Sequence, residues 1–359
     1  MTEPTTLGEL VRSVDLLVTC GPGGVGKTTT AAALGLAAAR AGRSVVVVTI
    51  DPARRLADAL GVDGAASHDP HEVVGAVKGR GSFSALMLDA ERTFDQLIID
   101  HAGEAAEAIL RNRIYRSIAG SLSGAQSYMA IERLHQLHFS GDYDLVIIDT
   151  PPSRHAIDVL EAPDRLNSFL SNPVYRALTL PGRSFAKVTN AATTAFLWTV
   201  KRLAGPSIVE DTVEFFRSIS GMEEGLRTRA AEMGALLRDA RTGFVLVSSP
   251  RAEAIDEASY LAEAIQRGGY RLGGVVVNLV HPEPPPLSLS AREIAAIDGP
   301  LAEQLAYHSE LTALAAAERR ELRALADLAG SAPVREVPLL DHDVHDLDAL
   351  GELGELLVG

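Results

Sequence analysis

The chain has 359 residues, 47% of them hydrophobic and 5% aromatic, which is enough for one large α/β domain or two small ones. Its net charge of −14 argues against binding of nucleic acid or an anionic membrane by the whole surface, so we expect no nucleic-acid partner. The single cysteine, Cys20, excludes a disulfide framework or a cysteine-based zinc site within one chain. The start, MTEPTTLGEL, does not resemble a signal peptide, and no run approaches 18 apolar residues, so we expect a cytoplasmic protein.

Short β-branched apolar runs alternate with helix-like segments along the chain, a pattern that predicts βα units and a parallel sheet. Val45 to Val48, for example, is apolar on both faces, as a buried parallel strand would be. The predicted strands cover residues 14–20, 44–50, 84–88, 143–149, 243–249, 273–279 and 334–338. The predicted helices cover about 27–41, 91–110, 112–139, 153–170, 190–204, 208–240, 252–267 and 304–329.

Two intervals between strands are longer than a βαβ crossover needs. They cover roughly 90–140 and 155–240, and both have helical patterns. We therefore predict an α/β protein with a mostly parallel, twisted sheet flanked by helices. It would form a single domain over residues 1–359, with a helical subdomain inserted at about 90–140 and 155–240.

The stretch CGPGGVGKTTT, residues 20–30, contains the phosphate-binding motif GxxxxGK[ST] between a hydrophobic strand and an alanine-rich helix. Its glycines let backbone N–H groups curl around phosphate oxygens, Lys27 adds a cation, and the Thr28 hydroxyl is a ligand for Mg²⁺. The sequence therefore predicts a P-loop NTPase fold. The predicted nucleotide contacts in this loop are Gly23, Gly24, Val25, Gly26, Lys27, Thr28 and Thr29.

Two carboxylates follow predicted strands. Asp51 opens DPARRL, where it can orient or deprotonate an attacking water, although a helix N-cap before Pro52 explains its position equally well. Asp149 ends YDLVIID, a Walker B pattern, so its carboxylate is expected to hold the Mg²⁺ hydration shell. We therefore predict Asp51 and Lys27 as catalytic residues and Thr28 with Asp149 as the metal site.

Asn278 stands near the end of the strand in GGVVVNLV, residues 273–280. An asparagine side chain can pair with the N6/N7 edge of adenine. Taken alone, an asparagine in a turn is the commoner explanation for this position.

Together, GPGGVGKTTT, DPARRL, DTPPSRH and VVVN resemble the ArsA-like ATPases, deviant Walker A proteins that include arsenite-pump ATPases and the ATPases that target tail-anchored membrane proteins. The resemblance spans nearly the whole chain and points to an actinobacterial branch. It implies an ATP- and Mg²⁺-dependent hydrolase whose dimer closes on ATP and opens after hydrolysis. It assigns Asp51 to the attacking water, Asp149 to the Mg²⁺ shell and Asn278 to adenine, and it implies that the stretch after Pro338 packs on the base.

The sequence departs from the family pattern in three ways. Pro22 replaces the signature lysine that reaches the partner's phosphates, and proline has neither a cation nor an N–H group. The arsenite-binding cysteines and the zinc-binding CxxC pair are missing from the sequence, so we do not expect an arsenite pump. Arg154 replaces the switch II glycine. Its guanidinium could approach phosphate, and a solvent-facing role explains it equally well.

Three explanations for Pro22 remain open. The chain forms a heterodimer with a lysine-bearing ArsA-like paralogue, or a homodimer that hydrolyses slowly with Arg54, Arg55 or Arg154 as substitute cation, or it binds nucleotide without turnover. A MinD/ParA-type positioning ATPase is a further alternative. The long helical insertions and the missing C-terminal amphipathic membrane helix count against it.

Residues 165–209 contain no Asp or Glu but six Lys and Arg, interleaved with apolar residues. One explanation is a site for a hydrophobic client or a membrane partner, which would place the protein at the membrane periphery. The other is a set of core helices with solvated basic edges. His281, His342 and His345 are interpreted as loop residues, and residues 340–350 as a solvated acidic patch.

Overall fold

The computed structural model describes residues 4–50, 55–60, 69–116, 123–152, 154–172, 175–176, 206–294 and 296–359. These residues form two compact units. The first unit consists of Met1–Met87, Tyr143–Ala156 and Ala240–Gly359, and the second of Leu88–Asp142 and Ile157–Asp239. Each unit is described separately below.

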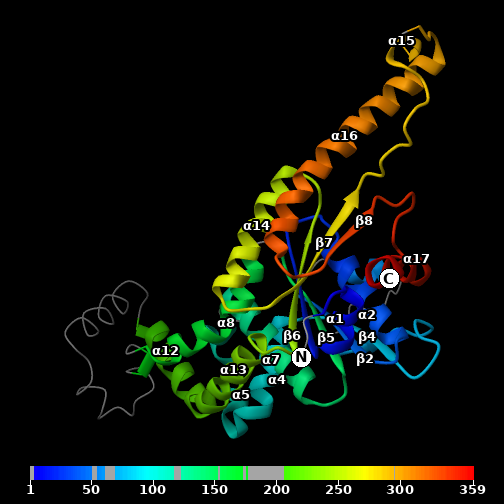
Figure 1. The fold of residues 1–359 in the computed structure, drawn as a ribbon. Helices are drawn as coiled ribbons and strands as arrows, with labels where there is room; N and C mark the ends of the chain where they lie inside the picture. The colour runs from blue at the N-terminus through cyan, green and yellow to red at the C-terminus, as the bar shows by residue number, and fades with distance from the viewer. Residues whose placement is uncertain are drawn as a thin grey trace. The chain divides into compact units, whose positions relative to one another are not determined.

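An eight-stranded sheet forms the centre of the first unit, in the order β3-β4-β2-β5-β1-β6-β7-β8 (Figure 1). Every neighbouring pair is parallel except β3 and β4. The strands are β1 (Leu16–Cys20), β2 (Ser44–Thr49), β3 (His71–Glu72), β4 (Ser82–Met87), β5 (Leu145–Asp149), β6 (Thr242–Ser248), β7 (Leu272–Val280) and β8 (Val334–Pro338). The predicted α/β fold with a mostly parallel sheet is confirmed.

The central strands are buried on both faces because helices cover the sheet. Every residue of β1, β5 and β6 is buried, which explains why their sequences are mostly apolar rather than alternating. β5 lies between β1 and β2, and the register sets Thr19 and Thr49 level with Asp149. The carboxyl ends of these three strands therefore bring polar side chains together at one edge of the sheet, where parallel α/β sheets bind ligands.

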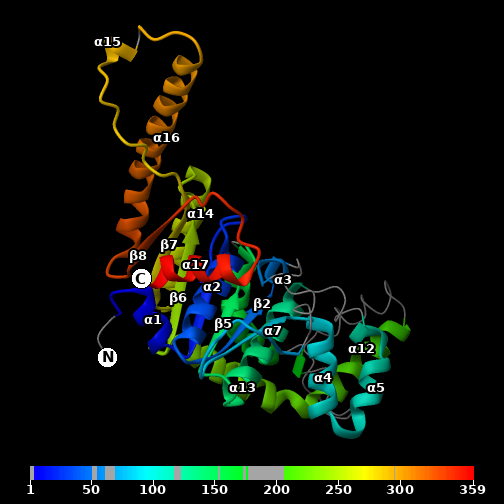
Figure 2. The ribbon, with the colours of Figure 1, turned by 90° about the vertical axis from the view of Figure 1, so that its right-hand side faces the viewer.

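The helices of the first unit include two at the chain ends that the sequence did not predict. They are α1 (Leu7–Ser13), α2 (Lys27–Arg40), α3 (Arg55–Leu60), α14 (Ala252–Arg267), α15 (Ala291–Ile294), α16 (Pro300–Ala329) and α17 (Leu347–Val358). The unpredicted α17 packs on α2, and a Cβ atom built on Gly354 would lie only 3.0 Å from the Ala33 carbonyl oxygen. Figure 2 shows α15 and the start of α16 extending away from the sheet.

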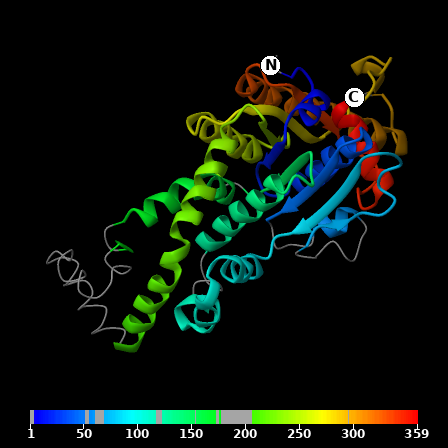
Figure 3. The ribbon, with the colours of Figure 1, turned by 90° about the horizontal axis from the view of Figure 1, so that it is seen from below.

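The second unit is helical. Its core contains Leu97, Ile98, Ile109, Tyr115, Met129, Phe215 and Met222. Its elements are α4 (Ala90–His101), η1 (Gly103–Ala105), α5 (Ala106–Arg111), α7 (Ser123–Phe139), α12 (Pro206–Ile219), η2 (Ser220–Met222) and α13 (Glu223–Leu237), and it also contains most of α8 (Arg154–Leu170). Helices α7 and α13 pack against each other (Figure 3).

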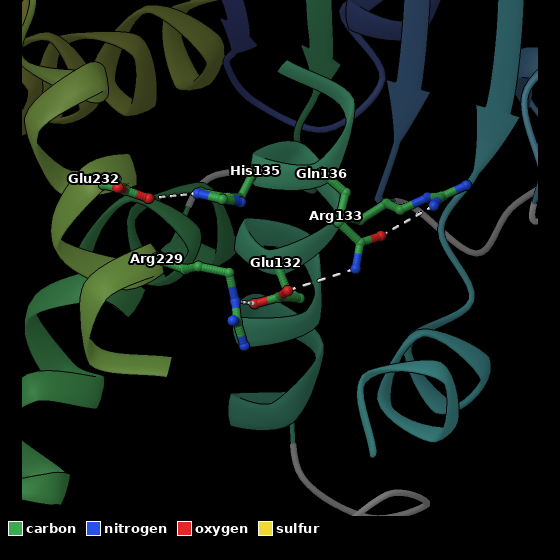
Figure 4. A network of polar contacts seen from close by, with 6 residues as sticks. All are labelled: Glu132, Arg133, His135, Gln136, Arg229 and Glu232. Atoms are coloured by element: carbon green, nitrogen blue, oxygen red, sulfur yellow. Dashed lines mark hydrogen bonds and ion pairs between the residues drawn. The ribbon is translucent and has the colours of Figure 1, made fainter. Parts of the chain in front are cut away.

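An ion pair and a histidine–carboxylate contact join these two helices (Figure 4). The Arg229 guanidinium donates from Nε to Glu132 Oε2 at 2.8 Å, and the Glu132 side chain is only 6% exposed. His135 Nε2 lies 2.7 Å from Glu232 Oε2. Since α7 and α13 come from different insertions, these contacts link the two insertions within the second unit.

Two long predicted helices are interrupted in the structure. The predicted helix over 91–110 breaks after α4, where Gly103 adopts the left-handed region with φ of 54°. The predicted helix over 208–240 breaks at η2, whose sequence is Ser-Gly-Met. The predicted helix over 190–204 lies outside the described residues. In the part of the chain that is described, no helix has the length and apolar character needed to cross a membrane.

Candidate functional site

The phosphate loop joins β1 to α2, and two of its glycines have close neighbours. Gly26 is the N-cap of α2 with φ of 87°, and a Cβ atom there would lie 2.4 Å from Asn278 Nδ2. A Cβ atom on Gly21 would lie 2.0 Å from the Val247 carbonyl oxygen. Gly24 has φ of 74° with no heavy atom within 4 Å of an added Cβ, so its requirement for glycine is conformational. The motif glycines are thus explained by backbone geometry and close approach.

Lys27 is the first residue of α2 and is buried, with 6% of its surface exposed. Its ammonium donates a hydrogen bond to the main-chain carbonyl of Pro22 at 2.7 Å. That carbonyl belongs to the backbone, so position 22 can hold Lys27 whichever side chain it carries. The proline therefore removes a cation from this position without removing this contact.

The Mg²⁺ site predicted from the sequence brings together residues far apart in the chain. The Thr28 hydroxyl donates to Asp149 Oδ2 at 2.7 Å, and Asp149 is buried at the end of β5. The proton of the Thr28 hydroxyl is used in this bond, so its lone pairs remain available to a cation. A hydroxyl and a carboxylate are the hard oxygen ligands that Mg²⁺ prefers, so these residues fit the ion.

A P-loop Mg²⁺ site needs few protein ligands, because phosphate oxygens and water complete the coordination. Among the residues that the structure describes, no group of three or more His, Cys, Asp or Glu could hold a metal by itself. The Thr28–Asp149 pair fits such a site, and its binding of Mg²⁺ stays a prediction.

Asn278 is brought to the phosphate loop by β7. Its side-chain amide donates to the Val25 carbonyl at 3.0 Å. The next residue, Leu279, has φ of 63°, and it is the one non-glycine residue with positive φ in the described part of the chain. Pro338 ends β8 opposite Val280 in the register. Asn278 thus contacts the loop, and Pro338 lies on the neighbouring strand, while their contact with a base stays a prediction.

A cavity of about 370 Å³ opens over the phosphate loop. That volume lies within the size range of small-molecule sites. Its lining residues are Gly24, Gly26, Lys27, Thr28, Thr29, Asp58, Ala59, Thr150, Val344 and His345.

Sequence reasoning missed several of these lining residues. His345, which we interpreted as a loop residue, reaches the cavity from the segment between β8 and α17. Asp58 lies in α3. The signal that could have found Val344 and His345 is the family resemblance, which implies that the stretch after Pro338 packs on the base.

Some predicted residues cannot be placed. Asp51 and Arg54 lie outside the described residues, so the catalytic role of Asp51 stays a prediction. Most of the basic segment 165–209 also lies outside them. Within it, Arg165 of α8 forms ion pairs with Asp158 and Glu161, both at 2.8 Å. Its side chain is 53% exposed, so Arg165 itself fits the solvated-edge explanation.

Cys20, at the end of β1, is fully enclosed beside the loop. Burial raises the pKa of its thiol to about 12, and the nearby Lys27 ammonium opposes this shift. Its Sγ donates to the Val245 carbonyl at 3.7 Å. The thiol is therefore a neutral, buried group, as expected of a small core residue.

Comparison with known proteins identifies the family. The family model described as anion-transporting ATPase matches residues 14–359. An "ATPase GET3" of Chaetomium globosum is 24% identical over 361 residues, which cover 99% of this chain and 94% of that protein. An uncharacterized protein of Streptomyces coelicolor is 28% identical over 341 residues, with 94% of this chain and 75% of that protein covered.

A third relative, from Aquifex aeolicus, is named provisionally as an arsenical pump-driving ATPase and is 23% identical over 273 residues, covering 74% of this chain and 80% of its own. The family match extends over almost the entire chain, and the phosphate loop and the Thr28–Asp149 pair that such an enzyme needs are in place. The chain therefore belongs to the anion-transporting ATPase, or ArsA, family, and this membership supports an ATPase function.

Proposed function

We propose that the chain binds Mg·ATP at the phosphate loop and hydrolyses it to ADP and phosphate. The observation that carries this proposal is the hydrogen bond between Thr28 and Asp149 beside a cavity that Lys27 and the loop glycines line. The carboxyl ends of β1 and β5 meet the start of α2 there. The positive N-terminal end of the α2 dipole favours the negative phosphates.

Each residue has a role in this proposal. The backbone N–H groups of Gly23, Gly24, Val25 and Gly26, with Thr29, hold the phosphates, and Lys27 neutralises their charge. Thr28 and Asp149 hold Mg²⁺, which when bound would offset charge on the β- and γ-phosphates. Asp51 orients the attacking water, while Asn278 and the stretch after Pro338 hold adenine.

The finer function is a nucleotide-driven dimer switch. In this proposal, the dimer closes on ATP and opens after hydrolysis, within one ATPase domain that carries a helical subdomain. A hydrophobic client or a membrane partner would meet residues 165–209. The protein would act in the cytoplasm, with peripheral membrane contact where the client requires it, and without a nucleic-acid partner.

A second candidate function is favoured by one observation, the proline at position 22. An arginine supplied in trans raises phosphoryl-transfer rates by about 10³–10⁵, and a lysine in the same place would act through the same positive charge. A chain without that cation would serve as a weakly catalytic or non-catalytic partner of a lysine-bearing paralogue. This second function predicts that the chain forms a heterodimer in the presence of nucleotide but does not hydrolyse ATP by itself. A nucleotide-dependent gradient on DNA or membrane would indicate a MinD/ParA-type ATPase instead.

The proposed ATPase is tested by phosphate release from Mg·ATP with two lysine variants. Lys27→Ala removes the buried cation of the loop, and Lys78→Ala removes an exposed lysine elsewhere in the same unit. We expect Lys27→Ala to reduce turnover to background and Lys78→Ala to retain the parent rate. Equal phosphate release by both variants would contradict the assignment.

A further inference from the structure

Two threonine hydroxyls converge on one oxygen of Asp149. Thr28 donates to Oδ2 from the start of α2 at 2.7 Å, and Thr49 donates to the same oxygen from the end of β2 at 2.9 Å. Thr49 is 1% exposed, so its hydroxyl is enclosed. Because β2 and β5 pair with Thr49 opposite Asp149, the backbone register itself sets this contact.

The strand on the other side of β5 provides a comparison. Thr19 of β1 also lies opposite Asp149 and is fully buried, but its hydroxyl donates to the Ile148 main-chain carbonyl at 3.1 Å. Thr19 and Thr49 therefore have the same residue type, burial and level in the sheet. They differ in one respect, since only the Thr49 hydroxyl is bonded to the carboxylate.

A second donor has a defined consequence for a metal-binding carboxylate. Rotation of a carboxylate about its Cβ–Cγ bond is broad, and each hydroxyl that donates to Asp149 restrains it further. A donor from β2 and another from α2 fix the carboxylate plane from two sides. The fixed Oδ2 in turn keeps the Thr28 proton directed at Asp149 and leaves its lone pairs for the ion. Partners of this kind orient metal ligands in many metal sites.

We propose that Thr49 is a positioning residue for Mg²⁺, acting through Asp149 without contacting the ion. This proposal rests on the proposed function, because it requires that Thr28 and Asp149 receive Mg²⁺ with the nucleotide. It adds a third residue, from a different strand, to the two that the sequence motifs mark. It also links the metal site to β2, the strand that leads into Asp51.

The experiment measures nucleotide binding rather than turnover. The full chain is mixed with a fluorescent N-methylanthraniloyl derivative of ATP in EDTA and then titrated with MgCl₂, and the Mg²⁺ concentration for half-maximal binding is recorded. Thr49→Val removes the hydroxyl while keeping the shape, Thr49→Ser restores a hydroxyl, and Thr19→Val is the matched control. Thermal unfolding of each variant is measured beside it, with Thr49→Ala as a second variant if Thr49→Val does not fold.

We expect Thr49→Val to raise the half-maximal Mg²⁺ concentration about tenfold, with nucleotide binding in EDTA unchanged. Thr49→Ser should stay near the parent value, and so should Thr19→Val, even where Thr19→Val lowers the unfolding temperature as much as Thr49→Val does. An unchanged Mg²⁺ midpoint in Thr49→Val, or an equal shift in Thr19→Val, would overturn the proposal. If the parent chain binds the nucleotide with no dependence on Mg²⁺, the Mg²⁺ site of the proposed function is wrong as well. The parent chain thus distinguishes failure of the Mg²⁺ site from failure of the Thr49 proposal alone.

Discussion

Asn278 donates its side-chain amide to the main-chain carbonyl of Val25 at 3.0 Å, across 253 positions of the chain. This bond ties β7 to the phosphate loop, so Asn278 has a structural role whether or not it meets adenine. Its carbonyl oxygen and second amide hydrogen are the atoms that a base edge would use. The two roles make different predictions for nucleotide selectivity.

Asn278→Ala is expected to weaken ATP binding about tenfold and GTP binding much less, since a bidentate contact to a base edge is worth about 1–3 kcal/mol of discrimination. Equilibrium titration with both nucleotides measures this. Asn112→Ala is the control, because Asn112 also donates to a main-chain carbonyl, that of Asp211 at 3.1 Å, within the helical unit. Equal losses for ATP and GTP would leave Asn278 as a loop anchor and refute its role at adenine.

Gly26→Ala is expected to abolish nucleotide binding. A Cβ atom at this position would meet Asn278 Nδ2 at 2.4 Å, on a backbone whose φ of 87° already disfavours alanine. Gly42→Ala is the matched control, since Gly42 has φ of 100° but no heavy atom within 4 Å of the added Cβ. Isothermal titration calorimetry should show ATP binding by Gly42→Ala and none by Gly26→Ala. If Gly26→Ala binds ATP with the affinity of the parent chain, the loop adjusts to the added Cβ atom and the prediction is wrong.

Pro22→Lys is expected to raise the turnover number of the purified chain, because it adds the cation that the resemblance places at the partner's phosphates. The contact from Lys27 to the carbonyl at position 22 is a backbone contact and should survive the change. Pro22→Ala is the control, since it removes the ring without adding a charge. If both variants hydrolyse Mg·ATP at the parent rate, the missing lysine does not limit this chain.

We expect burial of the Cys20 thiol to lower the free energy of unfolding at alkaline pH. Its pKa is raised from an ordinary value of 9.0 to about 12 in the folded chain, so the folded thiol keeps its proton after the unfolded thiol has lost it. The unfolded state then binds fewer protons, and the free energy of unfolding falls by about 1.4 kcal/mol per pH unit between these two pKa values.

This Cys20 contribution is isolated by comparing the parent with Cys20→Ala in urea unfolding near pH 8 and near pH 10. The parent should lose more stability than the variant over this interval. Thiol labelling at about pH 8 provides a second readout, and it should proceed only when the chain unfolds. A parallel decline in both chains would contradict the burial effect.

Arg229→Met is expected to destabilise the helical unit by about 3–5 kcal/mol, because it leaves the buried Glu132 carboxylate without its charged partner. Arg111→Met breaks the Arg111–Glu107 pair, whose side chains are 76% and 75% exposed, and should cost less than about 1 kcal/mol. Urea unfolding monitored by circular dichroism compares the two variants. Similar losses in both would show that the α7–α13 pair is solvated.

The sequence predicted the sheet well because its central strands are apolar on both faces and end in polar residues. Asp149 and the loop motif were found in this way, since each lies next to a strand end. Thr49 could not be found, because threonine is a common strand residue and its bond to Asp149 depends on the pairing of two distant segments.

The C-terminal segment shows another limit. The acidic residues around 340–350 indicated a solvated patch, yet Asp346 caps α17, whose Leu350, Leu353 and Leu357 are buried. The spacing of these leucines is typical of an amphipathic helix, but the neighbouring acidic residues favoured the interpretation as a solvated patch. Once α17 packs on α2, the preceding loop brings His345 to the cavity, a placement that no local pattern encodes.

The proposed dimeric ATPase is tested by the rate of Mg·ATP hydrolysis by the purified chain over a range of protein concentrations, with Asp51→Asn as the control. We expect activity per molecule to rise with concentration, as a dimer forms, and Asp51→Asn to be inactive. ATP binding with turnover at background at every concentration would contradict it, and the chain would then be a nucleotide-binding partner for a lysine-bearing subunit.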